Sequence, residues 1–217
     1  MWNVEVVQGS ARAFHARDLP DPVTRTLWWF EVDTPAIVLG SSQPISDIDA
    51  AACDAAGVEV VRRRSGGGAV LLEPGDAVWV DVLLPRDDRL WVDDVGRSAW
   101  WLGGAWQRAL HSLGMTGTSV HRGRMVTSSW SARVCFAGIG GGEVVLDGHK
   151  VVGISQRRTR AGARYQCVVY RRWHPTALTT LLSPPQPTID VVEPLAAPVP
   201  GTMQAIQAAL LAALPSD

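Results

Sequence analysis

Residues 58–70 read VEVVRRRSGGGAV, a β-branched run that turns basic and then passes through three glycines into a second apolar run. The flanking runs are typical of strands, and successive glycines leave backbone N–H groups unshielded by side chains. Arg62, Arg63 and Arg64 add guanidinium donors suited to phosphate or carboxylate. We therefore expect an anion-binding loop between two strands. A flexible, solvated turn would explain the glycines but not the adjoining basic run.

Two common nucleotide-binding patterns are absent from this loop. It does not fit GxxxxGK[ST], because no lysine follows the glycines and a strand rather than a helix comes next. It also lacks the GxGxxG spacing of a dinucleotide-binding turn. A second glycine-rich run, at residues 138–142, is interrupted by other residues and is interpreted as a mobile loop.

The segments on both sides of residues 58–70 predict a protein of mixed helices and strands. Patterns typical of strands occur at residues 4–7, 26–33, 36–40, 77–85 and within 133–170. Patterns typical of helices occur at residues 46–57, 93–115, after Trp173 and at about 202–214. Residues 26–33 (TLWWFEVD) are apolar enough to be buried on both faces. We expect Ser46 to cap its helix, and Trp100, Trp101 and Trp106 to pack in the core.

The composition excludes several classes of protein. With 47% hydrophobic residues, 19% charged residues and a net charge of −1, the chain offers no electrostatic argument for a nucleic-acid partner. No segment is long enough to cross a bilayer, and the N-terminus has no basic region followed by an apolar run, so we expect a cytoplasmic protein without a membrane partner. The spacing of Cys53, Cys135 and Cys167 and the scattered histidines indicate neither disulfides nor a metal site.

Residues 148–155 (GHKVVGIS) contain the only lysine in the chain, Lys150, whereas nineteen arginines carry every other basic side chain. Asp147-Gly148 before it is a strong two-residue hairpin signal. Strand alternation places Lys150 on the face opposite Gly153 and Ser155. A solvated lysine beside a turn is the simpler interpretation, but a compact ammonium on a flexible stem can also follow a moving negative charge.

The two segments VEVVRRRSGGGAV and LDGHKVVGISQRR together resemble the signature regions of the biotin/lipoate A/B protein ligase superfamily, most closely the lipoate-protein ligase A catalytic domain. The resemblance covers about residues 26–172 and includes Arg63 to Val70 residue for residue. It implies a single α/β (α+β) domain with a mixed, mostly antiparallel sheet backed by helices. We expect residues 1–183 to form this domain, and residues 184–217 to be a proline-rich connection and a C-terminal helix packed on it.

The resemblance also implies a function. Lipoate or octanoate would be activated with ATP and Mg²⁺ as an acyl-adenylate and passed to a lysine of a lipoyl carrier domain, in a 2-oxoacid dehydrogenase or the glycine cleavage H protein. Lys150 would hold the substrate carboxylate and the α-phosphate. The binding residues implied by the resemblance are Arg63, Arg64, Ser65, Gly66, Gly67, Gly68, Ala69, Gly153 and Ser155.

Three features depart from the family pattern. Leu72-Glu73 stands where these enzymes often have histidine-aspartate, and Gln166-Cys167-Val168 stands where they usually have glutamine-histidine-glycine. Only a short segment follows Trp173 in place of an accessory domain, so a separate accessory protein is a possible partner.

Two alternatives to an ATP-dependent ligase remain open. Octanoyltransferases of the superfamily use a cysteine to form an acyl-thioester, and Cys135, fifteen residues before Lys150, resembles that residue. A thiolate is a competent nucleophile, and Arg133 is close enough in sequence to favour it. Packing as a small buried hydrophobe is the simpler role for this cysteine. The other alternative is a member that binds an acyl group or a carrier without turnover.

Overall fold

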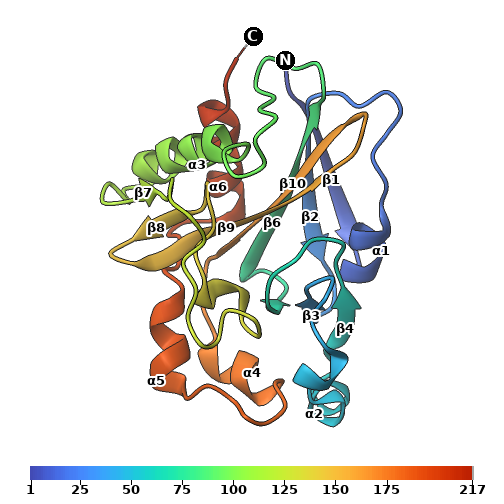
Figure 1. Cartoon of the computed structure of the whole chain (residues 1–217), viewed down its shortest axis with the longest axis vertical. Coiled ribbons are helices and arrows are strands. Elements are labelled where there is room, and N and C mark those ends of the chain that lie inside the picture. Colours follow the sequence, from blue (N-terminus) through green and yellow to red (C-terminus); the bar gives the residue numbers. More distant parts are fainter. Residues whose placement is uncertain (217) are drawn as a thin grey trace.

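The computed structural model describes residues 1–216. A seven-stranded mixed sheet dominates it, in the order β1-β2-β6-β10-β9-β8-β7, and a three-stranded sheet has the order β4-β3-β5 (Figure 1). The strands are β1 (Asn3–Gly9), β2 (Thr26–Val32), β3 (Ala36–Leu39), β4 (Glu59–Arg62), β5 (Val70–Leu72), β6 (Ala77–Pro85), β7 (Ser119–Val120), β8 (Val144–Leu146), β9 (His149–Arg158) and β10 (Gly162–Tyr170). The helices are α1 (Ala11–Ala16), α2 (Ala50–Ala55), α3 (Trp100–Ser112), α4 (Pro175–Thr180), α5 (Ile189–Val192) and α6 (Met203–Ala213), with 3₁₀ turns η1 (Ile45–Asp47), η2 (Cys135–Ala137) and η3 (Glu193–Leu195).

Most strand pairs are antiparallel, and the parallel ones are β1 with β2 and β3 with β4. The predicted single α+β domain with a mixed sheet backed by helices is therefore confirmed.

The central strands β2 and β6 supply side chains to two cores, one on each face of the large sheet. On β2, Leu27 and Trp29 join one buried cluster while Trp28 and Phe30 join the other. Because successive side chains of a strand point to opposite faces, both faces of this strand must be covered. The prediction of burial on both sides is confirmed for residues 26–30, whereas Glu31 is partly buried and Asp33 is exposed.

Helices α3 and α6 lie side by side over one face of the large sheet (Figure 1). Trp106 of α3 and Ile206 and Leu210 of α6 are fully buried in the core between these helices and the sheet. The predicted helix over 93–115 is shorter, because α3 begins only at Trp100. Residues 95–99 form turns, and the side chain of Asp94 before them accepts a hydrogen bond from Gly96 N.

The small sheet packs on the other face of the large one and continues into a third core, in which Cys53 of α2 is buried. The helix predicted from Ser46 is divided in the structure. Residues Ile45–Asp47 form a 3₁₀ turn, and Asp49, not Ser46, caps α2 by accepting a hydrogen bond from Ala52 N.

The hairpin of β8 and β9 turns at Asp147-Gly148, as predicted, and both residues adopt positive φ, 51° and 86°. Its register is interrupted, because Val145 pairs with Lys150 whereas Val144 pairs with Val152. A β-bulge at Val151 thus adds one residue to β9. The bulge changes the alternation along the strand, so Lys150 and Gly153 both face one cavity and are not on opposite faces as strict alternation predicts.

The segment after β10 returns to the large sheet before α6. Ala197 N donates to Lys150 O, so this segment lies against the start of β9, and Val199 N donates to Tyr170 O. Within residues 1–216, none of the helices has the length and apolar character needed to cross a membrane.

Candidate functional site

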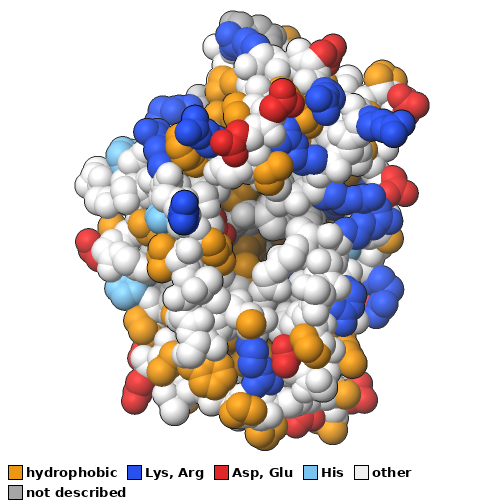
Figure 2. All heavy atoms as spheres, in the orientation of Figure 1, with side chains coloured by type: hydrophobic (Ala, Val, Ile, Leu, Met, Phe, Trp, Pro, Cys, Tyr) orange, Lys and Arg blue, Asp and Glu red, His pale blue; other side chains and the backbone are white. Residues whose placement is uncertain are grey.

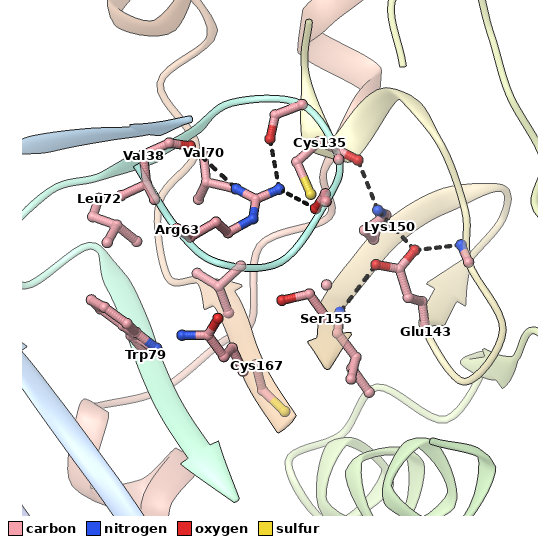
Figure 3. Close-up of a pocket in the computed structure, with 18 of the residues that line it drawn as sticks. Val38, Arg63, Val70, Leu72, Trp79, Cys135, Glu143, Lys150, Ser155 and Cys167 are labelled. Atoms are coloured by element: carbon pink, nitrogen blue, oxygen red, sulfur yellow. Dashed lines mark hydrogen bonds and ion pairs between the residues drawn. The ribbon is translucent and has the colours of Figure 1, made fainter. Parts of the chain in front are cut away.

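A cavity of about 280 Å³ lies between the two sheets. The small sheet contributes Val38, Val70 and Leu72 to its wall, and β9 and β10 contribute a second wall. Figure 2 shows it as a hollow at the centre of the face, with apolar side chains inside and Lys or Arg side chains at one side. In Figure 3, Val38, Leu72 and Trp79 lie at one end and Lys150 and Glu143 at the other. The cavity thus has an apolar end and an ionic end.

The glycine loop forms part of the cavity wall, as the sequence predicts. Gly66, Gly67 and Gly68 all line it, and Gly67 has a φ of +103°. A side chain on Gly67 would place its Cβ 2.8 Å from Arg63 Nη2, and one on Gly68 would reach the backbone of Val134. Only glycine permits this close packing.

Arg63 holds the loop rather than extending freely into the cavity. Its Nη1 donates to Val38 O at 3.2 Å, and its Nη2 donates to Gly66 O at 2.8 Å and Gly68 O at 2.9 Å. The side chain is buried, and its Nε is buried without a hydrogen-bond partner. The guanidinium therefore shapes the loop and also brings a positive charge to the cavity wall.

The neighbouring sequence-predicted residues divide between cavity and surface. Ser65 Oγ lies 3.0 Å from Ser155 Oγ, and Ser155 lines the cavity. Arg64 points to the surface and pairs with Asp18 at 2.6 Å, while Arg62 donates to backbone carbonyls of residues 40–43. Ala69 is buried beneath the loop and is not in the cavity wall.

Lys150 lies at the ionic end of the cavity and is 2% exposed. Its Nζ is 2.8 Å from Glu143 Oε2 and donates to Cys135 O at 2.9 Å, above the ring of Phe136. The solvated-lysine interpretation is wrong for this structure. Gly153, two positions from the bulge, also lines the cavity, and a Cβ there would meet Phe136 and Val168 at ordinary contact distance.

Among the three cysteines, Cys135 is the one that both lines the cavity and contacts Lys150. It is partly buried, whereas Cys53 lies in a core away from the cavity. Cys167 lines the cavity, but its burial raises the pKa of its thiol well above the usual value. Arg133 does not assist Cys135, because its guanidinium turns away to Asp47 and to the carbonyl of Ser183.

Four further residues line the cavity. Gln166 stands at the glutamine of the family pattern, whereas Glu143, His15 and Trp79 do not follow from the motifs. Gln166 Nε2 lies 3.3 Å from His15 Nδ1, and the His15 ring packs 4.5 Å from that of Trp79. Burial, Arg164 and Arg63 lower the pKa of His15 to about 3, so its ring is neutral. For Glu143 the sequence offers one signal, an acidic residue between a glycine run and an otherwise apolar strand.

Helix α1 brings His15 to the cavity because Arg164 of β10 anchors it. Arg164 Nη2 donates to Phe14 O at 2.7 Å, and its Nε donates to Asp81 on β6, a pair that is almost fully buried. Burial raises the pKa of Asp81, which the Arg164 charge opposes.

The cavity suits a ligand that has an anionic or polar head group on an apolar chain. The ionic end offers an ammonium, glycine-loop amides and hydroxyls, and the opposite end offers a wall of aliphatic and aromatic side chains. Within residues 1–216 there is no group of three or more His, Cys, Asp or Glu side chains arranged to hold a metal ion.

Comparison with known proteins identifies a family for this chain. The family model of the lipoyl protein ligase A/B catalytic domain matches residues 12–214. No curated protein matches the sequence of this chain.

Several solved structures share the fold at low sequence identity. A candidate lipoate protein ligase from T. acidophilum with bound lipoic acid has 15% identity and a TM-score of 0.72, over 98% of this chain and 82% of that one. A bi-partite lipoate protein ligase, studied with its E2 lipoyl domain from Thermoplasma acidophilum, has 16% identity and a TM-score of 0.73, over 98% and 80%. A lipoate-protein ligase A bound with ATP has 16% identity and a TM-score of 0.69, over 98% and 82%.

Proposed function

Because the chain belongs to the lipoyl protein ligase A/B catalytic domain family, we propose that it activates lipoate or octanoate with ATP and transfers the acyl group to a lysine of a lipoyl carrier domain. The observation that carries the proposal is Lys150, a buried ammonium at the ionic end of an apolar-walled cavity, beside the glycine loop. An acyl chain fits the apolar wall, and its carboxylate fits the ammonium.

The reaction proceeds in two steps. The acid's carboxylate oxygen attacks the α-phosphorus of ATP, forming the acyl-adenylate and releasing pyrophosphate. The carrier lysine's amine then attacks the acyl carbonyl, and AMP and a proton leave. Lys150 stabilises the negative charge that develops on the oxygens of both steps, because a fixed cation in a site with little water acts strongly on such charge. Mg²⁺ enters with ATP as part of the substrate.

Relatives support the choice of substrates and partner. One related structure contains lipoic acid, another contains ATP, and a third is of a ligase and its E2 lipoyl domain. We propose that the carrier is a lipoyl domain of a 2-oxoacid dehydrogenase or the glycine cleavage H protein. The bi-partite relative also supports the possibility of a separate accessory protein.

The test combines purified protein, ATP, Mg²⁺, lipoate or octanoate and a lipoyl domain, with and without a candidate accessory protein. We expect pyrophosphate release and a carrier whose mass increases by one acyl group. Lys150→Ala should abolish both, because it removes the ammonium from the cavity. Absence of pyrophosphate and of carrier labelling with both acids would contradict the ligase assignment.

Cys135 carries a second candidate function, an octanoyltransferase that works through an acyl-thioester. Its side chain lines the cavity, and its own carbonyl accepts a hydrogen bond from Lys150. The thiolate would attack the carbonyl of a thioester donor and release the donor thiol, and the carrier amine would then take the acyl group. Lys150 would stabilise the oxyanion of each step.

Intact-mass measurement separates the two functions. Incubation with an octanoyl-thioester donor and without ATP should add one octanoyl group to the protein if Cys135 is the nucleophile, and Cys135→Ala should remove that addition. A ligase should instead retain most of its ATP-dependent activity in Cys135→Ala. Binding of acyl ligand or carrier with neither activity would indicate a non-catalytic member.

A further inference from the structure

Glu143 is a buried carboxylate that accepts hydrogen bonds from three separate parts of the chain. Its Oε2 accepts from Gly140 N at 2.6 Å and lies 2.8 Å from Lys150 Nζ, and its Oε1 accepts from Ile154 N at 3.0 Å. The residue is 4% exposed. The dashed lines around Glu143 in Figure 3 show that it joins the second glycine run to both sides of the bulge in β9.

The carboxylate is held more firmly than the lysine it contacts. Two backbone amides fix its position, whereas Lys150 reaches it on a flexible four-carbon stem. An ammonium has three N–H donors. Glu143 and the carbonyl of Cys135 take two of them, at 2.8 and 2.9 Å. One N–H therefore remains, at a position where both Lys150 and Glu143 line the cavity.

The burial of this pair gives Glu143 a second effect. An ammonium that is 2% exposed is stable in its charged form only with a counter-ion, because transfer of a charge from water into the protein is costly. Arg63, the other cation in the cavity wall, donates to backbone carbonyls. Among the residues that line the cavity, Glu143 is the one carboxylate.

We propose that Glu143 is the positioning residue for Lys150. It orients the ammonium, so that the third N–H points to the oxygen on which negative charge develops during acyl transfer. The inference rests on the proposed acyl transfer, and it applies equally to an adenylate and a thioester. The second glycine run acquires a role as well, since it presents the amide of Gly140 that fixes the carboxylate.

The kinetic test compares Glu143→Gln, Glu143→Asp and Asp88→Asn with the unchanged protein in acyl transfer to a lipoyl domain. Glutamine keeps the shape of Glu143 but not its charge. We expect kcat to fall about 100-fold while KM for the acyl donor changes less than about threefold, because the interaction is made in the transition state. Aspartate keeps the charge and should give an intermediate kcat. Asp88 is the matched control, because it forms a similarly buried ion pair with Arg25 away from the cavity.

A second measurement needs no activity. Because Lys150 is the only lysine, protein labelled with ¹⁵N-lysine gives one Nζ resonance. In the unchanged protein we expect this resonance to be observable, since a buried, hydrogen-bonded ammonium exchanges its protons slowly. Glu143→Gln should shift it or broaden it beyond detection, and Asp88→Asn should leave it in place.

The two measurements separate failure of the inference from failure of the proposed function. If the protein transfers acyl groups and Glu143→Gln alters neither kcat nor the lysine resonance, the inference is wrong. A lysine resonance that depends on Glu143 in a protein that acylates no carrier would refute the proposed function and leave the positioning of Lys150 by Glu143 supported.

Discussion

Arg63 and Arg64 are adjacent in sequence, and their guanidinium groups have different surroundings. Arg63 is buried and satisfies three carbonyls of β3 and the glycine loop. Arg64 is 43% exposed and pairs with Asp18 on the surface. Since exposed ion pairs contribute little to stability whereas unsatisfied buried carbonyls are costly, the two arginines should respond differently to substitution.

We expect Arg63→Lys to reduce the free energy of unfolding by about 1–3 kcal/mol, the cost of leaving buried acceptors unpaired, because one ammonium cannot reproduce the planar fork. Arg64→Ala should leave the melting temperature unchanged. Thermal or urea unfolding followed by circular dichroism measures both. A larger loss for Arg64→Ala than for Arg63→Lys would contradict the assignment of Arg63 as the residue that holds the loop.

The sequence predicts some residues of the cavity and misses others for a physical reason. The glycines stand in a local pattern that predicts a close backbone approach, whereas Lys150 is assigned to the site only by the resemblance, because its local pattern favours a solvated side chain. Whether Arg63 binds a ligand or its own backbone depends on the position of Val38, twenty-five residues away. His15 enters the cavity only because Arg164 anchors the carbonyl end of α1. Contacts between residues so far apart in sequence leave no recognisable pattern in the residues around either partner.

The end of β3 and the glycine loop meet backbone to backbone. A Cβ on Gly40 would lie 1.9 Å from Gly67 O, so no side chain fits between these two elements. Gly40 itself does not line the cavity. It therefore offers a way to displace the loop without changing any group that contacts a ligand.

We predict that Gly40→Ala lowers acyl-transfer activity at least about tenfold by moving Gly67, because misplacement of a binding group by about 1 Å can cost on the order of 100-fold. Gly57→Ala is a suitable control for the extra methyl group, since it lies in a turn where nothing is within 4 Å of a Cβ, although its φ of +64° makes some loss of stability expected. Activity normalised to the folded fraction is the measurement. Full activity of folded Gly40→Ala would show that the loop tolerates displacement.

The sequence patterns predict the bounds of the strands better than the start of helix α3. The strands follow their apolar patterns closely, and the range 77–85 is exact. Helix α3 starts seven residues later than the pattern from Asp93 indicates, because the acidic residues that suit a helix start are instead followed by turns. The bulge at Val151 is also absent from the pattern, since Val151 and Val152 are both buried and look alike in sequence.

At the scale of the whole molecule, stability should depend on pH through His15. Its folded pKa of about 3 lies below the unfolded value of 6.5, so the unfolded state binds a proton more readily between these values. The contribution is fully present above pH 6.5 and is lost as the pH falls toward 3. The slope approaches about 1.4 kcal/mol per pH unit within this window.

His15→Phe tests this dependence, because phenylalanine retains a ring beside Trp79 and does not titrate. The free energy of unfolding of the variant, measured by urea titration from pH 7 to pH 4, should decline less than that of the unchanged protein. Asp18, whose pKa is lowered by the hydrogen bond from Arg64, is present in both proteins and contributes equally to the two profiles. Parallel pH profiles for the two proteins would contradict a neutral, buried His15.

The arrangement of the sheets is the part of the fold that local patterns convey least. The strands that form the cavity come from residues 36–39, 70–72, 149–158 and 162–170, and the sequence order does not specify that a three-stranded sheet packs on a seven-stranded one. The resemblance of two motifs to a family implied only a mixed, mostly antiparallel sheet backed by helices, and not the second sheet. The pairing is set instead by β2 and β6, whose two apolar faces require a layer on each side.

The single lysine has a consequence for the proposed acyl transfer to an amine. A reactive acyl-adenylate modifies whatever amines it meets, and on this chain Lys150 is the only side chain of that kind, with 2% of its surface accessible. The arginines that carry the remaining basic charge do not form amides under such conditions, since they stay protonated. Under the proposed adenylate mechanism the amines open to self-acylation are therefore Lys150 and the α-amino group of Met1, whereas an acyl group that is labile to hydroxylamine, as a thioester is, would indicate a cysteine.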